Sequence, residues 1–359
     1  MSAGIIAEKI RNLAVSIGKP VRLMEVCGTH TVAIFRHGIR DLLPEGISLI
    51  SGPGCPVCVT AIEDVEIAMA IAKKENVIFA TFGDMMRVPG IKKNLSDIRA
   101  EGADIRVVYS PVDALKIASE NKDKKVVFFA TGFETTSPSV AGTLFEADRT
   151  KADNFYIYSA HKIIPPALDA LLSSGEIKID GFILPGHVST IIGSRPYEFV
   201  AKKYGKPSVI TEFDAGDILQ GINMLLEQIA SDSAEVEIQY KKVVKEQGNP
   251  KAVALINEYF EPADAYWRGI GVIPLSGLKL RERFRHRDIN SVIDINISFA
   301  SGAGEPQGCS CGEVLRGIKT PDECPLFANV CTPDSPVGAC MVSTEGSCAA
   351  YYKYRGFGG

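Results

Sequence analysis

Nine cysteines, in two separated groups, are the residues of this chain best suited to chemistry. Near the front, Cys27 stands alone, and Cys55 and Cys58 form a Cys-Pro-Val-Cys motif. The other six lie in the C-terminal tail, at Cys309, Cys311, Cys324, Cys331, Cys340 and Cys348. Cysteine sulfur is a soft metal ligand and also exchanges electrons through disulfides. We therefore expect two kinds of sulfur chemistry on one polypeptide.

The front cysteines lie in motifs that suit either metal binding or redox chemistry. Cys55 and Cys58 follow a strand pattern and open a helical one. Because only two residues separate them, they could form a disulfide or bind one soft metal. Cys27 and His30 are three residues apart, which places both on one face of a helical turn. They could bind iron, zinc or copper together, or His30 could activate Cys27 as a nucleophile. Gly28 beside them predicts a backbone that another segment approaches closely.

The tail has no pair of Cys-x-x-Cys knuckles of the kind found in zinc modules. Its cysteines lie at irregular intervals among prolines, which favours an iron–sulfur cluster over zinc or structural disulfides. Cys324 is followed by proline, as in many cluster-binding runs. Since a cluster needs only four cysteines, the two left over could form a disulfide beside it.

The bulk composition narrows the class of protein. A net charge of −4 and the lack of a long basic tract argue against a nucleic-acid partner. Arg281, Arg283, Arg285 and Arg287 alternate as they would on the exposed face of a strand. No apolar run is long enough for a membrane span, and the charged, helical N-terminus is unlike a signal peptide. We expect a cytoplasmic protein.

The order of predicted elements indicates an α/β fold. Residues 47–230 alternate short β-branched runs with helical patterns, which predicts parallel sheets covered by helices. Seven strands could form one sheet, but two smaller α/β units joined near residues 148–153 fit the pattern better. We expect an N-terminal helix and Cys27/His30 segment over 1–46, packed on the C-terminal domain. A first α/β domain with the Cys-x-x-Cys motif is expected over 47–147 and a second α/β domain over 148–230. The remainder, 231–359, is expected to form a mainly helical or irregular C-terminal domain. Helices are expected within the last part at 235–246 and 251–259.

Polar loops follow several of the predicted strands directly. They span 51–58, 82–87, 131–136, 160–162 and 185–190, and they carry Asp84, Glu134 and His187 among other residues. Ligands of open α/β sheets bind beyond the carboxyl ends of the strands. Because these loops occupy the same topological position, we expect them to share the rim of one site.

Taken together, the motifs resemble those of the HypD family, maturation proteins of [NiFe] hydrogenases. The resemblance runs nearly end to end and rests on Met24–Thr31, Gly52–Cys58, Gly132–Thr136, Pro185–Gly193 and the tail. The cluster pattern of that family, C-x14-C-x6-C-x16-C, falls without departure on Cys309, Cys324, Cys331 and Cys348. Cys311 and Cys340 are then the spare pair, available for an auxiliary disulfide.

The resemblance implies a fold and a function that residue chemistry alone does not give. The fold would be two similar α/β domains around a cleft, with a third domain whose four matching cysteines hold a [4Fe–4S] cluster. With a small partner, HypC, such a protein holds iron while cyanide, supplied by HypE, and carbon monoxide are added. The Fe(CN)2CO unit is destined for the hydrogenase large subunit.

The resemblance also assigns expected roles to individual residues. Cys27 would bind the iron, with His30 as second ligand, acid–base group or orienter. Cys55 and Cys58 would switch between dithiol and disulfide, fed by the cluster. Asp84, Glu134 and His187 are further catalytic candidates. We expect an assembly scaffold with thiol redox activity rather than a conventional turnover enzyme.

Two other classes fit the residues without the resemblance. A stand-alone, cluster-dependent thiol–disulfide oxidoreductase would use Cys55 and Cys58 as its working pair and would not need Cys27. A zinc-stabilised binding module would have no redox function. Metal analysis of fresh anaerobic protein separates the zinc module from the other two.

Overall fold

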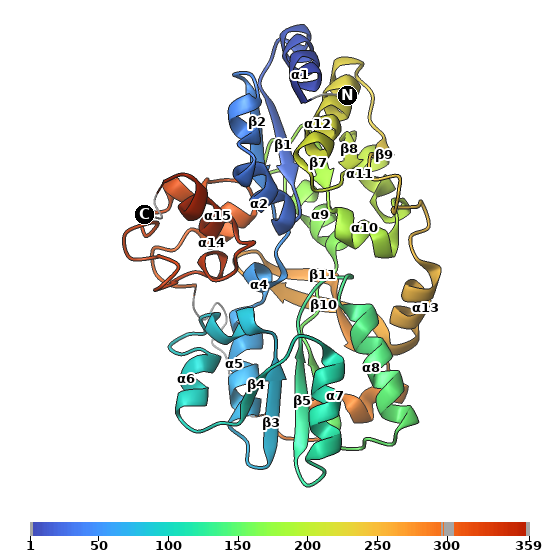
Figure 1. The fold of residues 1–359 in the computed structure, drawn as a ribbon, viewed down its shortest axis with the longest axis vertical. Coiled ribbons are helices and arrows are strands. Elements are labelled where there is room, and N and C mark those ends of the chain that lie inside the picture. The colour runs from blue at the N-terminus through green and yellow to red at the C-terminus, as the bar shows by residue number, and fades with distance from the viewer. Residues whose placement is uncertain (1–2, 296, 298–304, 357–359) are drawn as a thin grey trace.

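Two parallel sheets and a hairpin organise the chain, and the computed structural model describes residues 3–295, 297 and 305–356 (Figure 1). The larger sheet has the order β2-β1-β7-β8-β9 and comprises Ile47–Ser51, Val21–Glu25, Gly181–Leu184, Ser208–Ile210 and Val236–Ile238. The smaller has the order β4-β3-β5-β6 and comprises Ile105–Val107, Val77–Thr81, Lys125–Ala130 and Phe155–Ser159. The hairpin pairs β10 (Phe260–Trp267) with β11 (Gly271–Leu280). We call the two α/β parts the five-stranded unit and the four-stranded unit.

Helices accompany both sheets. Those of the five-stranded unit are α1 (Ala3–Ile17), α2 (Gly28–Arg36), α3 (Ile39–Leu42), α9 (Ile164–Ser173), α10 (Gly186–Ile192), α11 (Glu198–Tyr204) and α12 (Ala215–Ala230). Those of the four-stranded unit are α5 (Ile62–Ala72), α6 (Leu95–Ala100), α7 (Pro111–Glu120) and α8 (Ser137–Arg149). The others are α4 (Pro56–Val59), α13 (Pro250–Tyr259), α14 (Cys311–Leu315) and α15 (Ser347–Tyr354).

Local sequence accounts for many of these elements. Strand β3 is buried along its whole length, so it reads as a continuous apolar run. Helix α7 begins after Ser110, whose side chain accepts from the Val112 N–H, and it has Pro111 in its first turn. Asn249 caps α13 in the same way. The predicted α/β class is confirmed by the two parallel sheets.

Strand pairing corrects the expected domain boundaries. From the sequence, β2 belongs with the first α/β domain and β6 with the second. In the structure β2 pairs with β1 of the five-stranded unit, and β6 pairs with β5 of the four-stranded unit. The chain leaves the five-stranded unit after β2, completes the four-stranded unit, and returns at α9. Strand β1 is missed because Arg22 and Glu25 interrupt its apolar pattern.

Three further expectations are corrected. Within the described residues, helix α1 packs on α12 instead of on the C-terminal domain: its Ile6 and Ile10 belong to one core cluster with Ile218 and Ile222. The segment after Cys27 does meet the tail, since α2 packs on α15. Residues 236–238 form the edge strand β9 instead of a helix. The arginine tract forms a 3-10 turn, Glu282–Arg287, instead of a strand, and its buried last residue, Arg287, pairs with the partly exposed Asp148 at 2.7 Å.

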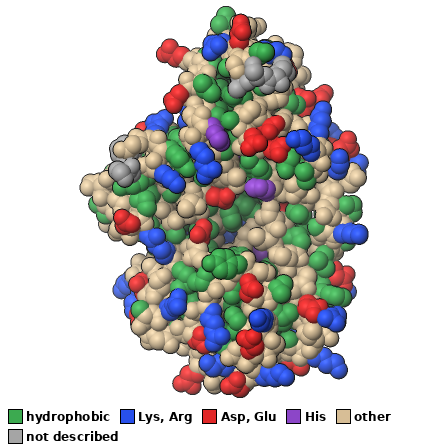
Figure 2. All heavy atoms as spheres, in the orientation of Figure 1, with side chains coloured by type: hydrophobic (Ala, Val, Ile, Leu, Met, Phe, Trp, Pro, Cys, Tyr) green, Lys and Arg blue, Asp and Glu red, His purple; other side chains and the backbone are tan. Residues whose placement is uncertain are grey.

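The tail lies where the two units meet. Figure 1 places α14 and α15 beside α2 and α4, and Figure 2 shows that this face is hollowed between the units. The loops that follow β1, β2, β5 and β7 approach the same region from both sheets. The fold therefore gathers the carboxyl ends of both sheets and the tail around one place.

Candidate thiol site

Cys27 lies at the start of α2, directly after β1, and is buried. The Cys55 loop packs on its backbone: a Cβ on Gly54 would come within 2.2 Å of the Cys27 nitrogen. The Gly28 N–H also donates to the Gly54 carbonyl at 3.0 Å. Only glycine permits this approach, so the two front motifs form one structural site.

Burial controls the charge of the Cys27 thiol. It raises the pKa of Cys27 to about 12, and the nearby Glu345 carboxylate adds to this shift. Backbone N–H groups of Thr29 and His30 offset part of it. The thiol is therefore protonated near neutral pH, and only a strongly favoured partner such as a metal cation would replace its proton.

A cavity of about 300 Å³ lies beside Cys27. Its apolar lining comes from both units: Val26, Pro56, Phe133, Pro185, Val188 and Ile191. Its polar lining is short: Thr29, Thr135, His187, Thr190 and Glu345 beside the thiol. Largely apolar walls with a few polar groups are typical of small-ligand sites. Four of the loops that line it follow strands, as expected for a site at the carboxyl ends of parallel sheets.

His30 is held away from this chemistry. Its Nε2 contacts the Thr211 hydroxyl at 2.8 Å and the Glu212 carbonyl oxygen at 3.1 Å. A carbonyl oxygen only accepts, so Nε2 carries the proton and Nδ1 keeps its lone pair. Burial lowers the pKa of His30 to about 4, so the ring is neutral near neutral pH. Because the His30 ring is fixed in this way, it is suited to holding α2 in its orientation.

His187 is the histidine that lines the Cys27 cavity. Its ring stacks on Phe213 with centroids 4.0 Å apart, and Phe213 in turn contacts the His30 ring at 4.6 Å. Phe213 therefore bridges the two imidazoles. The Pro185–Thr190 loop thus borders the cavity beside Cys27, whereas the Cys-x-x-His spacing alone pointed to His30.

Cys55 and Cys58 lie at the first turn of α4 and are both buried. The Cys58 N–H points at the Cys55 sulfur, 3.4 Å away. Burial raises the pKa of Cys58 well above its usual value, so this thiol is protonated. The pair is free in the structure, like the other seven cysteines, all of which lie in the described ranges.

The tail cysteines continue the line of sulfur from this pair. Cys58 and Cys340 belong to one buried core cluster, and their thiols interact. The Cys340 and Cys311 sulfurs are 2.9 Å apart, and Cys311 contacts Cys309 in turn. Cys55, Cys58, Cys340, Cys311 and Cys309 thus form a continuous chain of thiols. The fold brings the two groups of cysteines together.

The four cysteines of the cluster pattern adjoin this chain at different points: Cys309 ends it, Cys348 interacts with Cys340, and Cys331 interacts with both Cys309 and Cys348. The Ser310 N–H points at the Cys324 sulfur at 3.4 Å, and the Val337 N–H at the Cys331 sulfur at 3.3 Å. A Cβ at position 338 would come within 2.8 Å of the Cys309 sulfur, which explains Gly338. Such N–H groups tune thiolates that bind iron. Within the described residues no three acidic, histidine or cysteine side chains form a ready metal site. The donor set nevertheless fits a cluster in chemistry, since it offers four thiols and sulfur-directed N–H groups.

Asp84 and Glu134 have separate positions. Asp84 accepts a hydrogen bond from Ser343 of the tail at 3.3 Å. Glu134 is buried, and its Oε1 accepts from the Ile164 N–H at 3.0 Å. Its Oε2 has no hydrogen-bond partner among the described residues, and burial raises the pKa of Glu134 to about 7. Glu134 thus holds the start of α9, where the chain returns to the five-stranded unit.

Two acidic residues near Cys27 were missed by the sequence reasoning. Glu25 is fully buried in β1, accepts from the Thr31 hydroxyl at 2.7 Å, and has its pKa raised to about 7 by burial. Its signal was a carboxylate inside an apolar strand, two residues before Cys27. Glu345 accepts from the Thr29 hydroxyl at 2.8 Å. Nothing local in the sequence indicates that contact, since the partners are 316 residues apart.

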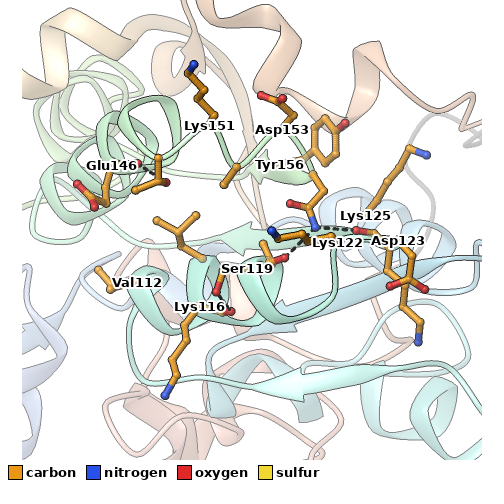
Figure 3. A pocket seen from close by; sticks show the side chains of 16 residues that line it. Val112, Lys116, Ser119, Lys122, Asp123, Lys125, Glu146, Lys151, Asp153 and Tyr156 are labelled. Carbon is orange, nitrogen blue, oxygen red and sulfur yellow. Dashed lines mark hydrogen bonds between the residues drawn. The ribbon is translucent and has the colours of Figure 1, made fainter.

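A second pocket, of about 790 Å³, lies at the opposite end of the four-stranded sheet. Figure 3 shows its lining, which includes both lysines (Lys116, Lys122, Lys125 and Lys151) and acidic residues (Asp123, Glu146 and Asp153). It lies at the amino ends of β5 and β6 and contains no cysteine or histidine. The cavity beside Cys27 is therefore the candidate site, because it combines a thiol with converging loops.

The fold and the site define a two-unit α/β protein with a chain of thiols leading to a small cavity. Among the described residues, no helix is long and apolar enough to cross a membrane. A family model, HypD (hydrogenase formation hypA family), matches residues 2–355. The chain belongs to this family of hydrogenase maturation factors.

Curated relatives agree along nearly the whole chain. The chain is 46% identical to the hydrogenase maturation factor HypD of Rhodobacter capsulatus, covering 99% of this chain and 96% of that one. It is 44% identical to the HypD of Escherichia coli, covering 97% and 93%. It is 45% identical to the HypD of Cupriavidus necator, covering 95% and 91%.

Proposed function

We propose that this chain is a scaffold that, with a HypC-type partner, holds iron while cyanide and carbon monoxide are added. The Fe(CN)2CO unit would then pass to the large subunit of a [NiFe] hydrogenase, with cyanide supplied by a HypE-type protein. One observation carries the proposal: a buried thiol, Cys27, borders a small cavity that several loops and the tail enclose. Family membership places the chain in hydrogenase maturation and supports this choice of cargo.

Cys27 is proposed to bind the iron being assembled. A thiolate is a soft, strongly donating ligand suited to iron that carries cyanide and carbon monoxide. The cavity volume of about 300 Å³ equals roughly ten times the share of one water in the liquid. That is enough for an iron with small diatomic ligands. The partner is expected to supply a second thiolate from its own N-terminal cysteine.

Cys55 and Cys58 are proposed to act as a two-electron switch that the tail can reduce. The Cys340 sulfur would bond to Cys58 of a Cys55–Cys58 disulfide as that bond breaks, with the Cys340 proton passing to Cys55. Cys311 would then bond to Cys340, releasing Cys58, which takes the Cys311 proton. The tail pair loses two electrons and the front pair gains them. The Cys58–Cys340 and Cys311–Cys340 contacts support both steps.

Cys309, Cys324, Cys331 and Cys348 are proposed to hold a [4Fe–4S] cluster. Four thiols on irregular loops, with N–H groups directed at Cys324 and Cys331, support the assignment. A cluster bound there would supply electrons to the adjoining thiols. Cys311 and Cys340, which contact this group but lie outside the four, remain free for exchange.

The burial of the switch argues against the rival class of protein. A stand-alone thiol–disulfide oxidoreductase must present a reactive, accessible cysteine to its substrates. Here Cys55 and Cys58 are 4% and 0% exposed. The pair is accessible only to its own neighbours, which favours a device that serves the site beside it.

The proposal is tested by infrared spectroscopy of the chain purified anaerobically with its HypC-type partner. It predicts the bands of iron-bound cyanide and carbon monoxide in the complex, together with about four further irons per chain. A complex that carries no such bands, from cells that make active hydrogenase, would overturn it. Zinc in place of iron in the fresh protein would instead support the binding-module class.

A further inference from the structure

A short loop of the tail, Cys340–Gly346, touches both front thiol sites. At its start, the Cys340 thiol contacts Cys58. Near its end, the Glu345 carboxylate accepts a hydrogen bond of 2.8 Å from Thr29, two residues after Cys27. Glu345 also lines the Cys27 cavity and acts electrostatically on both Cys27 and His187. One loop thus connects the sulfur chain to the cavity.

The loop is closed on itself, so its two ends move together. A Cβ at Gly346 would come within 2.1 Å of the Cys340 carbonyl oxygen. The Gly346 N–H donates to the Ser343 carbonyl at 2.9 Å, and the Glu345 N–H points at the Ser343 hydroxyl at 3.2 Å. Ser343 is tied in turn to Asp84 of the four-stranded unit. Close-packed backbone with these bonds transmits a displacement instead of absorbing it.

The loop packs against α2 with no free space between the two backbones. A Cβ at Gly28 would lie 2.6 Å from both the Cβ and the carbonyl oxygen of Glu345. The backbone of Glu345 therefore rests directly on the first turn of α2, the helix that follows Cys27. This is the close approach that Gly28 predicts, and it confirms that prediction.

We propose that Glu345 is a positioning residue that couples the shape of the Cys27 cavity to the bonding state of Cys340. When Cys311 and Cys340 join, their sulfurs close from 2.9 Å to about 2.05 Å, which draws the start of the loop. Two electrons and two protons pass to the Cys55–Cys58 disulfide as that bond breaks. Through the closed loop, Glu345 shifts against Thr29 and changes access to Cys27. That this change of access would affect iron binding at Cys27 rests on the proposed function, but the coupling between Cys340 and the cavity does not.

The test measures how fast iodoacetamide alkylates Cys27, followed by mass spectrometry of its peptide. Full-length protein is prepared anaerobically as a Cys55→Ser, Cys58→Ser variant, so that Cys311 and Cys340 are the pair to be oxidised. Diamide, an azo oxidant, takes up their two electrons and two protons. We expect oxidation to change the Cys27 rate by about fivefold, the effect of one hydrogen bond gained or lost.

Matched substitutions separate coupling from simple damage to the fold. Glu345→Ala removes the acceptor of the Thr29–Glu345 hydrogen bond, and Thr29→Val removes its donor. Each substitution is expected to abolish most of the change that oxidation causes in the Cys27 alkylation rate. Glu345→Gln and Thr29→Ser keep an acceptor and a donor and are expected to retain it. Cys340→Ser is expected to show no effect of diamide. The readout is the difference in Cys27 alkylation rate between the oxidised and the reduced protein. A loss of stability alone would not remove this difference.

Three results would overturn the proposal: no change of the Cys27 rate on oxidation, a full change in the Glu345→Ala protein, or an equal loss in Glu345→Gln and Glu345→Ala. None of these readouts requires iron. Missing infrared bands would therefore count against the proposed function and leave the coupling intact.

Discussion

The backbone of Gly54 lies directly against the backbone of Cys27, with no room for a methyl group between them. This contact fixes the Cys-x-x-Cys loop to the residue proposed to bind iron. Both the cavity and the switch depend on it, because the same loop carries Cys55 and borders the cavity through Pro56.

Gly54→Ala is expected to destabilise the protein by about 1 to 3 kcal/mol, the cost of forcing a methyl group into a packed contact. It should also displace the loop and reduce hydrogenase maturation in cells. Gly216→Ala is the matched control, since a Cβ at that position in α12 meets nothing within 4 Å. Urea unfolding of both variants measures the difference, and equal stabilities would contradict the contact.

Cys58 and Cys340 are expected to form a trapped disulfide when their other partners are removed. In a Cys55→Ser, Cys311→Ser variant, mild oxidation should join them, because their thiols interact within one buried cluster. Mass spectrometry of the non-reduced peptides detects the link. A Cys340→Ser addition provides the control, and a mixture of unrelated pairings would count against the proposed exchange route.

The proposed cluster ligands can be distinguished from the spare pair by substitution. Cys324→Ala should lose the broad visible absorption and about four irons per chain, because one of four ligands is missing. Cys311→Ser should keep both, since Cys311 lies outside the pattern. Iron analysis and absorption of anaerobic protein measure this. Loss of iron in both variants to the same extent would mean that the four ligands are wrongly assigned.

Glu134 is expected to make stability depend on pH. Its pKa is raised from 4.5 to about 7, so the folded protein keeps a proton that the unfolded chain has lost over this range. This stabilisation is complete below pH 4.5 and disappears as the pH rises through about 7. Between about pH 5 and pH 8 the free energy of unfolding should fall by about 2 to 3 kcal/mol more than in Glu134→Gln.

The Glu134 prediction has its own control on the surface. Arg149 lowers the pKa of the exposed Glu146, so that carboxylate is ionised in both states over the same range. Glu146→Gln should therefore leave the pH slope of the original protein unchanged. A Glu134→Gln protein with the same slope as its parent would contradict the raised pKa.

Much of the fold could be predicted, because buried parallel strands and capped helices leave local signals. The runs at β3 and β5 and the Ser110 and Asn249 caps are examples. Sheet membership could not be predicted, since β1 carries charged residues and β2 pairs with it instead of with β3. Strand order depends on contacts between distant segments, which no local pattern encodes.

The candidate site was predictable only where its residues leave local signals in the sequence. Motif spacing pointed to Cys27, Cys55 and Cys58, which remain candidates, and Gly28 correctly indicated a close approach. The spacing also favoured His30, although the folded chain turns that ring toward Thr211 and brings His187 to the cavity. Glu345 reaches the site only because the tail folds back across both units, so its place requires the tertiary structure.

The central claim is that Cys27 binds the iron, and one measurement tests it most directly. The infrared spectrum of a Cys27→Ala chain, isolated anaerobically with its HypC-type partner, is compared with that of a Cys311→Ser chain. We predict that Cys27→Ala loses the cyanide and carbon monoxide bands but keeps the cluster iron, whereas Cys311→Ser keeps the bands. Cyanide bands of unchanged position and strength in the Cys27→Ala complex would contradict the assignment.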